Sequence, residues 1–76
     1  MATDSDEFDM MDDQSLLHYL ERVVVKRDEQ LAIREVEGGW VAEAMSEGLT
    51  RATAFRGTGV DRRAAMVDLA RRLPRS

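Results

Sequence analysis

From Leu16 onward, apolar residues recur with the spacing of one face of an α-helix. The positions share one stripe of a helix with 3.6 residues per turn, and they are Leu16, Leu17, Leu20, Val23 and Val24. Asp12 or Asp13 can cap the free N–H groups at its start. The β-branched run of residues 23–25 leaves open a second interpretation, in which the helix stops near Arg22 and extended chain follows.

Past this helix the 3.6-residue period is lost, and short β-type segments alternate with glycines. We expect three antiparallel strands, residues 31–37, 40–45 and 49–56. Gly38-Gly39 is the predicted link of the first hairpin, because glycines accept the positive φ that tight hairpin turns demand. Gly57 and Gly59 are expected to end the sheet.

The second predicted strand is apolar on both faces. Side chains alternate along a strand, so Trp40, Ala42 and Ala44 share one face while Val41 and Met45 share the other. Helices can cover only one of these faces. The other favours a symmetric homodimer or a protein partner, with Trp40, Val41 and Met45 as the contact candidates. Trp40 suits an interface as an anchor and suits the core equally well as the bulkiest side chain.

A second amphipathic helix closes the predicted fold. Asp61 is its N-cap, Pro74 lies just past its end, and its buried stripe is Ala65, Met66, Leu69, Ala70 and Leu73. The order is then α-β-β-β-α. We therefore predict an α+β fold in which residues 12–76 form a single domain, a three-stranded antiparallel sheet with two helices packed on one face.

The sequence contains few residues that could act in catalysis or bind a metal ion. The 76 residues include no cysteine and one histidine, His18, so neither a disulfide nor a Cys/His zinc site can form. No nucleophile and base stand in a recognisable arrangement, and so short a chain leaves little room for a water-excluding cleft. We predict a non-enzymatic protein that needs no cofactor and no metal.

Charge is distributed unevenly along the chain. The first 13 residues carry six acidic and no basic groups, although the whole chain has a net charge of only −4. We expect residues 1–11 to be a disordered acidic tail, with Asp4, Asp6, Glu7 and Asp9 as its candidate binding residues. The tail can serve solubility alone, or mimic phosphate and shield arginines. An acidic start and the lack of a long apolar run predict a cytoplasmic protein without a membrane segment.

Arginines crowd the last third of the chain. The segment Gly57-Thr58-Gly59 leads into a helix start that carries Arg62 and Arg63, with Arg56 just before it. Free N–H groups and the positive end of a helix attract anions, so Arg56, Arg62 and Arg63 are candidates for binding an anion or nucleic acid. The alternative is that these glycines serve turn geometry only.

Two patterns stand out together, Gly38-Gly39-Trp40-Val41-Ala42-Glu43 and the later Gly59-x-Asp61-x-x-x-Ala65-Met66-x-x-Leu69-x-x-x-Leu73. With them, residues 31–73 resemble the HicB-type antitoxin domain, a truncated RNase H-like fold. Asp61 stands where that family has a threonine cap, and the two side chains are equivalent as N-caps. The resemblance implies a module that neutralises a toxin or binds another protein, often as an oligomer.

The order α-β-β-β-α also resembles the double-stranded-RNA-binding domain. Leu16-Leu17, Gly57-x-Gly59 and Arg62-Arg63-x-Ala65 occupy the places of that family's helix leucines, glycines and basic helix start. The hairpin at Gly38-Gly39 is too short for the loop that this family inserts into a minor groove. We therefore predict a protein-binding regulatory module, antitoxin-like or inhibitor-like, with nucleic-acid binding as the alternative.

Overall fold

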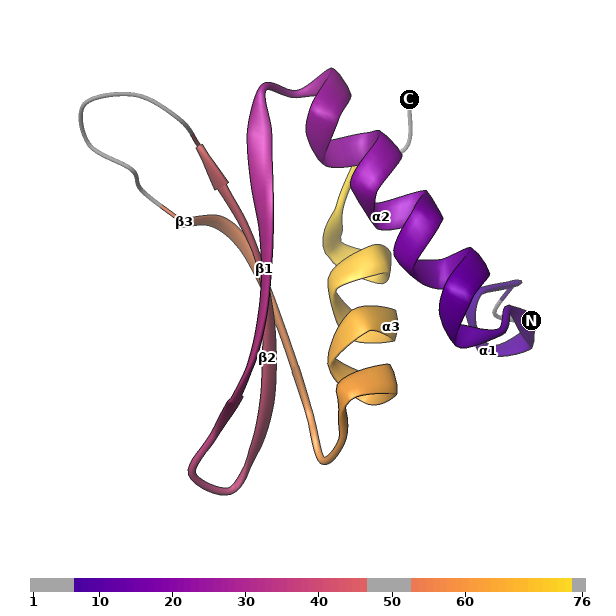
Figure 1. Cartoon of the computed structure of the whole chain (residues 1–76), viewed down its shortest axis with the longest axis vertical. Coiled ribbons are helices and arrows are strands. Elements are labelled where there is room, and N and C mark those ends of the chain that lie inside the picture. The colour runs from indigo at the N-terminus through magenta and orange to yellow at the C-terminus, as the bar shows by residue number, and fades with distance from the viewer. Residues whose placement is uncertain (1–6, 47–52, 75–76) are drawn as a thin grey trace.

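The computed structural model describes residues 7–46 and 53–74 as two layers, a sheet and the helices on one of its faces. Its sheet is antiparallel with the strand order β1-β2-β3, where β1 is Glu29–Val36, β2 is Gly39–Ser46 and β3 is Thr53–Gly59. Helices α2, Asp13–Lys26, and α3, Arg62–Arg72, both lie on the same side of this sheet (Figure 1). The predicted α-β-β-β-α architecture is confirmed, and a short helix, α1, precedes it.

Helix α2 begins at the cap that its sequence indicates. The carboxylate of Asp12 accepts a hydrogen bond of 2.8 Å from the backbone N–H of Ser15, which satisfies one of the free donors of the first turn. The helix continues through the β-branched run to Lys26, so it does not stop near Arg22. Its buried residues face the sheet and α3, and they are Leu16, Leu20, Val23 and Val24.

The β1–β2 hairpin turns one residue earlier than predicted. Val36 pairs with Gly39, so the two-residue turn is Glu37-Gly38, and only Gly38 there has a positive φ, of 86°. Gly39 belongs to the strand instead. A Cβ on Gly39 would lie 2.4 Å from the carbonyl oxygen of Gly59 across the sheet, which explains why a glycine is needed there too.

Strand β3 runs further toward the C-terminus than predicted, so Gly57 lies inside it and Gly59 is its last residue. Residues 49–52 of the predicted third strand lie outside the described residues. A Cβ on Gly57 would meet the backbone N of Leu69 at 2.2 Å and the carbonyl oxygen of Ala65 at 2.5 Å. Gly57 therefore lets the backbone of α3 pack directly on the strand, and neither turn geometry nor anion binding accounts for it.

Helix α3 begins at Asp61 as predicted. Asp61 has extended backbone, and its carboxylate accepts a 2.8 Å hydrogen bond from the N–H of Ala64. The apolar stripe of the helix lies on the sheet, with Ala65, Met66 and Leu69 fully buried. The cap thus sets where the helix starts relative to the glycines of β3.

Replacing this cap is expected to destabilise the domain moderately. Asp61→Ala removes the side-chain acceptor of the Ala64 N–H, and the expected loss is about 1 kcal/mol of unfolding free energy. Urea denaturation measures this loss. Asp61→Ser keeps a capping oxygen and is expected to recover most of it, whereas equal losses in both variants would contradict the role of the cap.

The N-terminal segment departs from the predicted disordered tail. Residues Glu7–Met10 form the short helix α1, and the side chain of Phe8 is buried, with 4% of its surface exposed. The Phe8 ring lies 5.2 Å from the ring of Tyr19, centroid to centroid. Residues 7–11 therefore pack on the domain because one aromatic side chain enters its core. Asp4 and Asp6 lie outside the described residues.

Candidate functional site

One face of the sheet lies opposite the helices, and we call it the open face (Figure 1). Side-chain alternation and the strand register assign its central residues, which are Ala32, Arg34, Val41, Glu43, Met45, Arg56 and Thr58. Leu31, Ile33, Ala42, Ala44 and Phe55 alternate with them and join the core on the helix side. The open face thus combines apolar groups with arginines and one carboxylate.

Glu43 forms the centre of the open face. Its side chain is only 3% exposed, although none of the described helices covers it, because two arginine side chains lie over it. Arg34 donates from Nη1 to Oε1 of Glu43. Arg56 donates from Nε to Oε2 at 3.1 Å, and its Nη2 forms an ion pair with the same oxygen, also at 3.1 Å. The arginine side chains are 52% and 57% exposed. We call this group the Arg34–Glu43–Arg56 bridge.

The bridge keeps Glu43 ionised. Burial of the carboxylate by itself would raise the pKa of Glu43, but the hydrogen bonds from Arg34 and Arg56, together with their positive charges, outweigh it. The pKa of Glu43 is therefore lower than the ordinary value of a glutamate. A charged carboxylate held between two guanidinium groups fixes the orientation of both arginines on the sheet surface.

The three residues predicted as partner contacts do not all lie on the same face of the sheet. Val41 and Met45 lie on the open face, whereas Trp40 lies on the helix side and packs partly buried against the core. At the hairpin end, Trp40 and Val41 both line a groove of about 370 Å³ together with the 84% exposed Val60. The three residues therefore do not form one contact surface.

The three predicted anion-binding arginines are also separated. Arg56 belongs to the bridge on the open face, while Arg62 and Arg63 lie on α3 across the sheet. Arg63 is engaged by the N-terminal segment, donating to the carboxylate of Asp13 at 2.9 Å and to the backbone carbonyl of Asp9 at 2.8 Å. No common anion site is built from these three side chains.

The described part of the acidic segment contacts α3. The carboxylate of Asp9 lies 3.1 Å from Nη2 of Arg71, so Asp9 meets one arginine through its side chain and another through its carbonyl. Asp13 and Asp9 therefore neutralise arginines that lie 50 and 62 positions later in the sequence. Of the predicted binding residues in the segment, Glu7 and Asp9 are described, and both are exposed.

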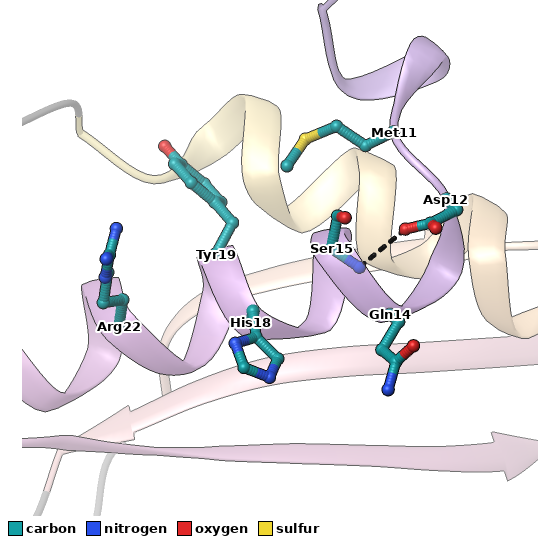
Figure 2. Close-up of a pocket in the computed structure, with 7 residues that line it drawn as sticks. All are labelled: Met11, Asp12, Gln14, Ser15, His18, Tyr19 and Arg22. Carbon is teal, nitrogen blue, oxygen red and sulfur yellow. Dashed lines mark hydrogen bonds between the residues drawn. The ribbon is translucent and has the colours of Figure 1, made fainter.

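A further groove, of about 430 Å³, runs beside the start of α2 and includes His18 (Figure 2). The lining side chains do not converge, since His18 and Gln14 project from a different side of the helix from Ser15 and Tyr19. Asp12 is occupied as the cap, and hydrogen bonds from the backbone and side chain of Ser15 lower its pKa. This arrangement does not form a nucleophile–base–acid system.

Reasoning from the sequence did not find the Arg34–Glu43–Arg56 bridge. Its three members are separated by 9 and 13 positions, and only the pairing of both hairpins places them together. The second predicted strand did contain a hint. Glu43 lies between Val41 and Met45 on a strand that is apolar on both faces, and a carboxylate buried there requires cationic neighbours. The strand register was needed to name those neighbours.

Within residues 7–46 and 53–74, no group of three or more His, Cys, Asp or Glu side chains is arranged to hold a metal ion. In this same part of the chain, no helix has the length and hydrophobicity to cross a bilayer. Comparison with protein-family models, curated proteins and solved structures found no match to this chain.

Proposed function

We propose that this protein is a non-enzymatic interaction module that binds a partner protein through the open face of its sheet. The observation that supports the proposal most is the Arg34–Glu43–Arg56 bridge, which holds two half-exposed arginines on the face opposite both helices. The sequence resemblance to the HicB-type antitoxin domain supports a regulatory role, antitoxin-like or inhibitor-like.

The composition of the open face suits a protein interface. Arginine and methionine are enriched in such interfaces, while lysine is depleted, and the open face carries Arg34, Arg56 and Met45 but no lysine. Glu43 holds the two guanidinium groups in place before any partner arrives. A side chain that is already ordered loses less conformational entropy on binding, so the bridge favours association.

The charge of the bridge favours an acidic partner over a second copy of this chain. Two arginines and one glutamate leave a net charge of +1 at the centre of the face. A symmetric dimer through this face would bring four guanidinium groups and two carboxylates together, and the excess positive charge would oppose it. A partner surface with a carboxylate opposite the bridge would instead be attracted.

Nucleic-acid binding is less well supported. Its three candidate arginines do not share a surface, and Arg63 already has acidic partners within the chain. Binding through several phosphates would also weaken steeply with added salt. A gel shift with duplex RNA that persists in low salt and disappears in Arg62→Glu/Arg63→Glu would favour nucleic acid over the proposed protein partner.

Photo-crosslinking in the producing cells tests the proposed interface. A benzoylphenylalanine at Thr58 or at Val36, both on the open face, is expected to capture the same protein. The same group at Gln14 or His18, exposed on α2, serves as the matched control and is expected not to capture it. Adducts from α2 positions alone, or none from the open face, would refute the proposal.

A further inference from the structure

We propose that the surface of α3 beneath α1 is a second binding site, separate from the open face, for an acidic peptide with an aromatic residue directly before a carboxylate. The chain's own α1, residues 7–10, occupies this site in the structure. Helix α1 is then an internal competitor that an external peptide of the same chemistry must displace.

The polar contacts of α1 are those of a bound peptide. Arg63 donates from Nη2 to a backbone carbonyl, that of Asp9, and from Nη1 to the carboxylate of Asp13. Arg71 donates to the carboxylate of Asp9. Within α1 itself, the two arginines thus contact one main-chain carbonyl and one carboxylate, both of Asp9, while Asp13 belongs to the start of α2. A main-chain carbonyl beside a carboxylate is what an acidic peptide offers.

An apolar anchor completes the site. Phe8 is almost fully buried and lies against Tyr19 of α2, whereas the neighbouring residues Glu7, Asp9 and Met10 are exposed. A ligand that displaces α1 must fill the space of this ring, since an empty apolar slot would cost the contacts that Phe8 makes. The required ligand therefore carries an aromatic side chain as well as carboxylates.

The attachment of α1 is suited to reversible release. A helix of four residues is too short to be stable alone, so α1 depends on its contacts with α2 and α3. Its ion pairs are solvent-exposed, with Asp9 at 60% and Arg71 at 47%, and exposed pairs are weak and screened by salt. Only Met11 and Asp12 join it to α2, so α1 can leave without unfolding that helix.

The surface beside α1 also has room for a longer ligand. A groove of about 300 Å³ follows the exposed side of α3, lined by Asp9, Asp61, Arg63, Ala64, Val67 and Arg71. Both arginines that hold α1 therefore line the groove. A peptide anchored like α1 would extend along it and keep the same two guanidinium groups as partners.

A labelled peptide with the sequence of residues 7–13 is the probe that tests the site. The full chain carrying Phe8→Ala/Asp9→Asn, which weakens its own α1, is expected to bind this peptide at least about tenfold more tightly than the wild type. The factor follows because a site that is free in a tenth of the molecules shows a tenfold weaker apparent affinity. Fluorescence anisotropy or NMR shifts measure both affinities.

Matched control variants distinguish specific binding of the peptide at this site from a general effect of charge. Val25→Ala/Glu37→Gln removes an exposed apolar side chain and one negative charge elsewhere, and it is expected to bind like the wild type. Adding Arg63→Glu/Arg71→Glu to the Phe8→Ala/Asp9→Asn variant is expected to abolish binding, as is replacing the phenylalanine of the peptide by alanine. Equal affinities of wild type and Phe8→Ala/Asp9→Asn, or equal gains in the control variant, would overturn the proposal.

Hydrogen exchange of the unmodified protein gives a test that does not depend on a variant folding. The amides of residues 8–11 are expected to exchange through a local opening, faster than those of Leu20 and Leu69 by at least about tenfold. Exchange of all these amides at one common rate would show that α1 leaves only on global unfolding. That result would overturn the proposal, whereas the crosslinking from the open face would remain valid.

Discussion

Gly57→Ala is expected to lower the free energy of unfolding by about 3 kcal/mol. The added Cβ would lie 2.2 Å from the backbone N of Leu69 and 2.7 Å from its Cα. Both obstacles are backbone atoms of α3, so no side-chain rotation relieves the clash. The helix must move away from the sheet, which opens the core around Ala65 and Leu69. Thermal or urea denaturation followed by circular dichroism measures the loss.

Thr58→Ala is the matched control for this substitution. Thr58 is the next residue on the same strand, but it is exposed and lies on the open face. Its backbone N–H donates to the carboxylate of Asp68, and the substitution leaves this bond intact. We expect a change within about 0.5 kcal/mol. A comparable loss in both variants, or none in Gly57→Ala, would contradict the direct packing of α3 on β3.

Glu43→Gln is expected to cost about 2 kcal/mol at neutral pH, because the buried acceptor of two charged hydrogen bonds loses its charge and gains an amide donor that faces guanidinium groups. The folded-state pKa of Glu43 lies below the ordinary value of 4.5. Its stabilising contribution is therefore complete above about pH 4.5 and is lost as the pH falls through the folded-state pKa.

Denaturant titrations of wild type and Glu43→Gln at pH 7 and at about pH 3 measure this dependence. The difference between the two proteins is expected to shrink at the lower pH, where the wild-type glutamate begins to take up its proton. Glu35→Gln removes a charge from an exposed residue of β1 and is expected to change stability by less than about 0.5 kcal/mol at either pH. A difference that stays constant with pH would contradict the ionised, arginine-bound state of Glu43.

Local signals predicted much of this fold. Asp12 and Asp61 cap their helices as expected, since a cap is a contact between residues three positions apart. The hairpin was placed to within one residue by its glycines. The end of the third strand was less well placed, because its glycines were interpreted as turn residues. They are required because a larger side chain would clash with α3, and this packing is visible only in the tertiary structure.

The candidate sites depended on long-range contacts. Glycines, arginines and acidic residues were recognised as notable, but their partners were not. The glycine pattern suggested an anion loop, yet Gly57 meets the backbone of α3. The acidic start suggested a disordered tail. In the structure the Phe8 side chain is buried in the core, and this places the carboxylate of Asp9 within hydrogen-bond distance of Arg71. In each case a contact with a residue distant in the sequence gave these residues a different role from the one their local pattern suggested.

The amino-acid sequence by itself determined the type and order of the two long helices and the three strands, because helical periodicity, caps and turn glycines act within a few residues of one another. Only the tertiary structure decided which side chains meet. Glu43 reaches its arginines through the register of the three strands. Helix α1 contacts α2 through the buried ring of Phe8 and α3 through the arginine partners of Asp9. Such contacts join residues distant in the chain, and they form only when burial of the common core brings the elements together.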